Sequence, residues 1–198
     1  MKFKELYEAA GITIDNTSKK KGKKKAVLVM GRFQPFTEAH ERIAKQAQKI
    51  NKNLVIGIIK GKKSSADKDK NPFDFKTQKQ MAKKVFPGAV VMEFGTGFLP
   101  TIMLDIRKAG VEIVGYVAGT DRIAGYEKQL GYFDKFAAED SEFEKPDVQP
   151  IHIKRTDSDT SATKVRNALK DGDEETFKRM TPKALHSEFN KLSKIINK

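Results

Sequence analysis

AVLVMGRFQPFTEAH, residues 26–40, is the most informative stretch of this chain. Its five leading apolar residues suit a buried strand, Gly31 opens a loop that Pro35 stiffens, and a helix-like stretch follows. A glycine lets the backbone come close to a bound anion, and a helix entrance offers free N–H groups and a favourable dipole. Thr37 and His40 stand at that entrance, so a hydroxyl and an imidazole would face one phosphate. We interpret the stretch as a phosphate-handling site.

From residue 26 onward, apolar runs alternate with amphipathic stretches, which predicts a doubly wound, Rossmann-like α/β fold with about five parallel strands and helices on both faces. Strands are expected near 26–30, 53–59, 89–94, 111–118 and 149–153, and helices near 38–51, 74–86, 99–109 and 121–131. In such a sheet, ligands lie beyond the carboxyl ends of the strands where the strand order switches. The loops after Gly31 and before Arg122 would both emerge there.

The chain is expected to divide into a basic tail or linker over 1–25, a main domain over 26–180 and a C-terminal helix over 181–198. Residues 11–25 combine small polar residues with a lysine block that cannot bury itself, so we expect them to be solvated. Pro182 precedes an apolar stripe at helical spacing, and this C-terminal helical extension is expected to pack on the core. The stripe consists of Leu185, Phe189, Leu192, Ile195 and Ile196.

Composition narrows the function classes. The 198 residues contain no cysteine, which excludes disulfides, thiol catalysis and thiolate metal sites and suits a reducing, cytoplasmic compartment. The amino terminus lacks the apolar region of a signal peptide, and no apolar run approaches the roughly 20 residues needed to span a bilayer. A net charge of +13 favours anionic partners, whether nucleotides, nucleic acid or an anionic membrane surface, and charge alone does not choose among them. We expect no membrane partner, and oligomeric state stays open.

Three segments further along the chain are also candidates for the site. SATKVR, residues 161–166, sits at an expected helix start and offers two hydroxyls and two cations, which suits a triphosphate tail. GTDR, residues 119–122, follows an apolar run, and NPF, residues 71–73, follows a basic loop. Of these segments, the Gly119 loop is expected to emerge beside the loop after Gly31, so sequence order converges on one crevice.

These segments resemble the cytidylyltransferase-like nucleotidyltransferase superfamily. Residues 31–40 resemble its G-x-F-x-P-x-[HT]-x-G-H signature, in wording closest to nicotinamide-mononucleotide adenylyltransferases, and residues 161–166 resemble its S-[AST]-T-x-[VI]-R motif. The G-[ST]-D-R and N-P-F elements have counterparts too, so the resemblance covers roughly residues 25–180. Ala39 departs from the signature, because the family has glycine there and the added methyl narrows the space for a nucleotide.

The resemblance implies transfer of a nucleoside monophosphate, AMP from ATP before CMP from CTP, to a phosphorylated small molecule with release of pyrophosphate. His40 and Thr37 would contact the α-phosphate, and Arg166 with Ser161 and Thr163 would hold the departing pyrophosphate. Mg2+ would arrive with the nucleoside triphosphate. Further nucleotide-binding candidates are Gly31, Arg32, Phe33, Gly119, Asp121 and Arg122, and Lys60 is the candidate for the acceptor's phosphate. Nicotinamide mononucleotide is the first acceptor candidate.

Structural alternatives remain for several of these residues. Thr37, Asp121, Ser161 and Thr163 also suit helix N-caps, and Arg166 suits a solvated helix position. Capping and ligand binding are compatible at one residue, so the sequence leaves these roles open.

Two other function classes compete. A chain with Ala39 could keep the fold and lose turnover, as a structural protein of a phage head. Leu6-Tyr7-Glu8 before Ala9 resembles the [LI]-x-E cleavage signal of tailed-phage prohead proteases. Such a protein would act in the bacterial host or be packaged in the virion, and its lysine-rich tail would meet head components or DNA. A basic nucleic-acid binder is the third class, and its affinity would fall steeply with salt.

Overall fold

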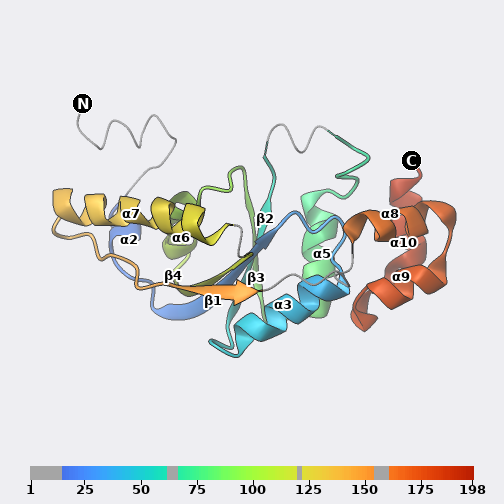
Figure 1. Cartoon of the computed structure of the whole chain (residues 1–198), viewed down its shortest axis with the longest axis horizontal. Coiled ribbons are helices and arrows are strands. Elements are labelled where there is room, and N and C mark those ends of the chain that lie inside the picture. The colour runs from blue at the N-terminus through green and yellow to red at the C-terminus, as the bar shows by residue number, and fades with distance from the viewer. Residues whose placement is uncertain (1–14, 62–66, 120–121, 154–160) are drawn as a thin grey trace.

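The computed structural model describes residues 15–61, 67–119, 122–153 and 161–198. Five strands form one all-parallel sheet in the order β3-β2-β1-β4-β5 (Figure 1). They are β1 (Lys24–Gly31), β2 (Leu54–Ile59), β3 (Val90–Phe94), β4 (Val111–Gly119) and β5 (Gln149–Ile153). Each coincides with a predicted apolar run, so the Rossmann-like fold class is confirmed.

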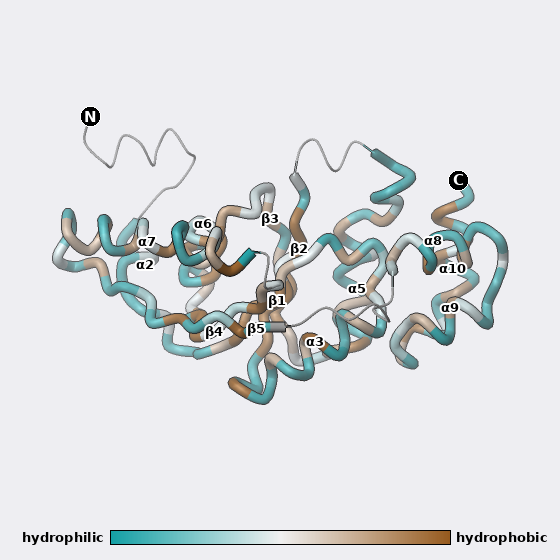
Figure 2. Tube along the Cα trace, in the orientation of Figure 1, coloured by the Kyte–Doolittle hydropathy of each residue, from teal (hydrophilic) through white to brown (hydrophobic). Residues whose placement is uncertain are grey.

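The side chains of the central strand β1 alternate between two apolar cores, one on each face of the sheet. Val27 and Val29 belong to the first core, while Ala26 and Leu28 belong to the second. This is the period of two that a strand imposes, and here both faces are covered. In Figure 2 the strands form the apolar centre of the molecule, and the helices carry most of the polar surface.

Helices cover both faces, as predicted. The first core is closed by α3 (Glu38–Gln48) and α5 (Phe75–Val85), and the second by α6 (Leu99–Lys108) and α7 (Ile123–Glu139). Helix α7 is longer than the predicted 121–131, because Phe133 and Phe136 continue its buried face. Within the described ranges, no helix is long and apolar enough to cross a membrane.

The C-terminal part is helical and packs on the first core. It comprises α8 (Ala162–Asp171), α9 (Glu174–Met180), the 3-10 helix η1 (Lys183–Glu188) and α10 (Phe189–Ile196). Leu185, Phe189 and Leu192 of the predicted apolar stripe are buried in that core. These helices gather at one end of the molecule, and α7 lies toward the other (Figure 1).

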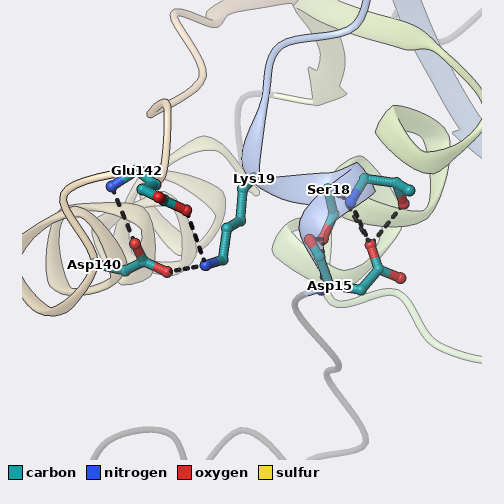
Figure 3. A network of polar contacts seen from close by, with 6 residues as sticks. Asp15, Ser18, Lys19, Asp140 and Glu142 are labelled. Carbon is teal, nitrogen blue, oxygen red and sulfur yellow. Dashed lines mark hydrogen bonds and ion pairs between the residues drawn. The ribbon is translucent and has the colours of Figure 1, made fainter.

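Residues 15–23 lie against the domain, although the sequence predicts a solvated linker over 11–25. Helix α2 (Asn16–Lys19) is capped by Asp15, whose carboxylate accepts a hydrogen bond from the backbone N–H of Ser18 at 3.0 Å. Ser18 is fully buried. The ammonium of Lys19 lies 2.8 Å from Asp140 and 3.5 Å from Glu142, at the end of α7 (Figure 3). Acidic partners thus neutralise Lys19, the first residue of the lysine block.

A buried ion pair explains why this segment packs. The guanidinium of Arg107 binds the carboxylate of Glu112 at 2.6 and 2.9 Å. It also donates to the carbonyl oxygens of Ser18 at 3.2 Å and Glu144 at 2.8 Å. Glu112 in turn accepts from the backbone N–H of Gly22 at 3.0 Å. Unpaired buried charges are costly, so the Arg107–Glu112 pair must keep its partners. It therefore holds residues 18–22 and the segment around Glu144 against the start of β4.

Candidate functional site

Two predicted site loops leave the sheet at the same edge. Strand β1 ends at Gly31 and its neighbour β4 ends at Gly119, and the two run parallel. The strand order turns from the β2–β3 side to the β4–β5 side between them. This is the switch point at which doubly wound sheets bind ligands.

The loop after β1 folds around an aromatic ring. Phe33 is buried and has a φ of +46°, a left-handed conformation that is uncommon outside glycine. A Cβ on Gly31 would lie 3.1 Å from the Phe33 ring, so the missing side chain makes room for that ring. The ring stacks on Phe36 at 5.1 Å between centroids and meets the His40 ring at 4.9 Å. Gly31 therefore sets where the loop meets α3.

Two glutamine side chains hold the loop in this conformation. The Gln78 amide, on α5, donates to the carbonyl oxygens of Arg32 and Phe33. The Gln34 amide donates to the carbonyl oxygen of Phe73 at 2.8 Å, and its own oxygen accepts the backbone N–H of Phe73 at 3.0 Å. Sequence reasoning did not select either glutamine, although Gln34 occupies a variable position within the signature over residues 31–40.

Thr37 and His40 meet at the start of α3, where Thr37 is the N-cap residue and is fully buried. The backbone N–H of Thr37 donates to His40 Nδ1 at 3.0 Å, and the Thr37 hydroxyl oxygen lies 3.0 Å from the same nitrogen. When Nδ1 accepts, a neutral imidazole carries its proton on Nε2. The arrangement therefore makes Nε2–H of His40 a hydrogen-bond donor on the first turn of the helix.

Arg166 reaches the same loop from α8. Its guanidinium donates from Nη1 to the carbonyl oxygen of Gln34 at 2.7 Å and from Nη2 to the Thr163 hydroxyl at 3.0 Å. Burial lowers the pKa of Arg166, and the charge of Arg32 lowers it further, while Asp67 acts weakly in the opposite direction. No carboxylate in the described ranges lies within ion-pair distance of it. A buried cation held only by neutral acceptors attracts an anion.

Ser161, Arg122 and Lys60 are further predicted site residues within the described ranges. Ser161 is the N-cap residue of α8, and Arg122 donates its backbone N–H to the carbonyl oxygen of Gly119 at 2.9 Å. Lys60 directly follows β2, and its ammonium lies 3.0 Å from Glu93, which partly neutralises it. Asp121 lies outside the described residues.

The described residues at this edge include the cations Arg166 and Lys60. Across the part of the chain that the structure describes, no three His, Asp or Glu side chains group closely enough to hold a metal ion.

The cytidylyltransferase-like family model matches residues 28–168, a span that includes both Gly31 and Arg166. The chain belongs to this family. No curated protein matches it. The matched span contains Thr37, His40, Thr163 and Arg166, the residues that the structure brings to one edge of the sheet.

Solved structures share the fold of this cytidylyltransferase-like chain. A bifunctional NMN adenylyltransferase/ADP ribose pyrophosphatase from Francisella tularensis has a TM-score of 0.56 at 17% identity, covering 88% of this chain and 50% of that one. Thermotoga maritima TmcAL bound with alpha-thio ATP has a TM-score of 0.55 at 17% identity, covering 85% and 56%. A putative nicotinate-nucleotide adenylyltransferase from Vibrio parahaemolyticus has a TM-score of 0.50 at 15% identity, covering 88% and 96%. This chain thus spans about half the length of the first two.

Proposed function

We propose that this chain transfers a nucleoside monophosphate, AMP from ATP in the first instance, to a phosphorylated small molecule and releases pyrophosphate. The observation that carries the proposal is the pairing of Arg166 with neutral acceptors beside the first turn of α3. This cation has no carboxylate partner among the described residues, and it contacts the loop after β1, which resembles the family's signature. Membership of the cytidylyltransferase-like family supports this assignment.

In the proposed reaction, an oxygen of the acceptor's phosphate attacks the α-phosphorus in line, and the bond to the pyrophosphate oxygen breaks. The protein positions the reactants and stabilises developing charge, without a covalent intermediate. Nε2–H of His40 donates to an α-phosphate oxygen, and Thr37 fixes the ring through Nδ1. The guanidinium of Arg166, with Thr163 and Ser161, binds the leaving pyrophosphate. Mg2+ bound with the nucleotide would neutralise part of the phosphate charge.

The acceptor is proposed from the family resemblance and from the cations near the sheet edge. Nicotinamide mononucleotide and nicotinate mononucleotide come first, because two of the similar structures are named for adenylyltransferases of such nucleotides. Phosphopantetheine and sugar or polyol phosphates follow. Lys60, which directly follows β2 and pairs with Glu93, is the proposed contact for the acceptor's phosphate.

The decisive assay measures pyrophosphate release with Mg2+, each of ATP, CTP, GTP and UTP, and a panel of these acceptors. His40→Asn keeps an acceptor near the position of Nδ1 but removes the distal donor, whereas His40→Gln places an N–H near the position of Nε2. We expect His40→Asn to lower turnover by about 10²-fold, the scale for one lost charge-stabilising donor, and His40→Gln to lose less. His186→Gln, a histidine of η1 that contacts the Thr181 carbonyl, is the control and should keep full turnover.

Equal turnover of the wild type and His40→Asn would contradict the role of His40. The alternative function is a chain that binds nucleotide without turnover, which Ala39 on the first turn of α3 favours. Nucleotide binding without pyrophosphate release across the whole panel would support that alternative.

A further inference from the structure

We propose that Gln34 is a positioning residue, which sets the guanidinium of Arg166 for the polyphosphate part of the nucleotide. The inference rests on the proposed function and assigns a role to a residue of the loop that does not itself need to touch the nucleotide. The carbonyl oxygen of Gln34 and the guanidinium of Arg166 are 2.7 Å from each other, although the two residues are 132 positions apart in sequence.

The Gln34 side chain is fixed at both polar atoms. Its N–H donates to the Phe73 carbonyl oxygen and its oxygen accepts the Phe73 N–H, so the amide has one orientation. The residue is 6% exposed, and water cannot readily replace either bond. If the Gln34 amide were removed, the buried N–H and carbonyl groups of Phe73 would have no hydrogen-bond partner, which is costly. The main chain at Gln34 is therefore held from the segment that precedes α5.

This fixed main chain offers Arg166 a neutral acceptor. A carboxylate in the same place would orient the guanidinium but also cancel its charge. The Gln34 carbonyl and the Thr163 hydroxyl orient it and leave the charge available. Two of the five guanidinium N–H donors are used in these bonds, and the others can serve an anion. A polyphosphate site needs a guanidinium that is held in place and keeps its positive charge.

The loop after β1 is also tied to helix α5. Phe73, which binds the Gln34 side chain, lies in the segment that leads into α5. Gln78 adds a second tie from α5 to the same loop through the Arg32 and Phe33 carbonyl oxygens. The loop is therefore held by α5 and its leading segment on one side, and it contacts Arg166 on the other.

The test compares binding of ATP and AMP, in the presence of Mg2+, by titration calorimetry. Gln34→Met keeps the size of the side chain and removes both bonds to Phe73. We expect it to weaken ATP binding about tenfold, the scale of a misplaced charged hydrogen bond, and AMP binding less than about twofold. Arg166→Met should weaken ATP binding at least as much. Because both variants act through one guanidinium, the double variant should bind ATP no worse than Arg166→Met alone.

Gln46→Met on the exposed face of α3 is the matched control and should bind both nucleotides like the wild type. Should Gln34→Met fail to fold, Gln34→Asn decides, because its shorter amide cannot reach both atoms of Phe73. Equal weakening of ATP and AMP, or additive losses in the double variant, would overturn the inference. Wild-type binding without transfer refutes only the proposed reaction, whereas no binding of either nucleotide refutes both.

Discussion

The carboxylate of Asp74 caps α5, the helix that carries Gln78 to the loop after β1. It accepts the backbone N–H of Thr77 at 2.8 Å, and hydrogen bonds from Thr77 lower the pKa of Asp74 below its ordinary value of 3.8. A depressed pKa means that the charged form stabilises the fold above pH 3.8, and that this stability is lost as the pH falls through the folded value. The cap therefore matters at neutral pH and fades in acid.

We expect Asp74→Ala to lower the free energy of unfolding by about 1 kcal/mol at pH 7, as for other lost N-caps. Asp74→Asn keeps an acceptor but cannot ionise, so it should cost less, and its difference from the wild type should shrink in acid. Urea unfolding at pH 7 and at about pH 3 measures both differences. A pH-independent gap between the wild type and Asp74→Asn would contradict the assignment.

Some site residues could be predicted from the sequence and others could not. The spacing of Thr37 and His40 predicted a helix entrance, and in the structure the backbone nitrogen of Thr37 lies 3.0 Å from His40 Nδ1. Gln34 gave no such signal, because its partners are main-chain atoms of Phe73, and main-chain atoms leave no trace in residue type. The positive φ of Phe33 was equally hidden, since sequence rules expect glycine there.

Among the elements, the close approach of residue 22 to β4 gives a sharp test. A Cβ on Gly22 would lie 2.5 Å from the carbonyl carbon of Val111 and 2.6 Å from the nitrogen of Glu112. Both are backbone atoms, which cannot rotate away as a side chain can. The segment from α2 to β1 would therefore have to move to relieve the clash. We expect Gly22→Ala to lower the free energy of unfolding by about 1–3 kcal/mol, the usual cost of overpacking.

Gly88→Ala is the matched control for this prediction, since a Cβ there meets nothing within 4 Å. Urea unfolding of both variants beside the wild type measures the difference. Equal stability of Gly22→Ala and Gly88→Ala would show that residues 15–23 are not held against β4 in solution.

The elements that the sequence revealed are those with a repeating apolar pattern. The five strands and α3, α5 and α6 each have such a pattern, and each lies where it was expected. Helix α7 runs past its predicted end at residue 131, because the buried Phe133 and Phe136 continue its apolar face. Helix α2 has no apolar pattern at all, and its position depends on Arg107, which is 89 positions from Ser18.

At the scale of the whole molecule, a net charge of +13 should act on how fast an anionic nucleotide arrives. Screening lengths fall from about 10 Å at 0.1 M salt to about 3 Å at 1 M. We expect the association rate of a fluorescent ATP analogue to fall about tenfold over this range, with a smaller change in its dissociation rate. Stopped-flow fluorescence separates the two rates.

A fluorescent adenosine without phosphates is the control ligand, and its association rate should hardly depend on salt. If salt instead acted mainly on dissociation of the ATP analogue, direct contacts such as that of Arg166 would carry the effect, and long-range attraction would not.

Because Gln34 and Arg166 are 132 positions apart, the ribosome makes Arg166 well after Gln34. At roughly 5–20 residues per second, a ribosome needs about 7–26 seconds to add Arg166 after Gln34 has been made. Strands β1 to β4 can pair in that interval, but the cation of α8 is still missing. Stabilisation by a bound nucleotide therefore comes late, and the nascent chain must fold most of its sheet without that help.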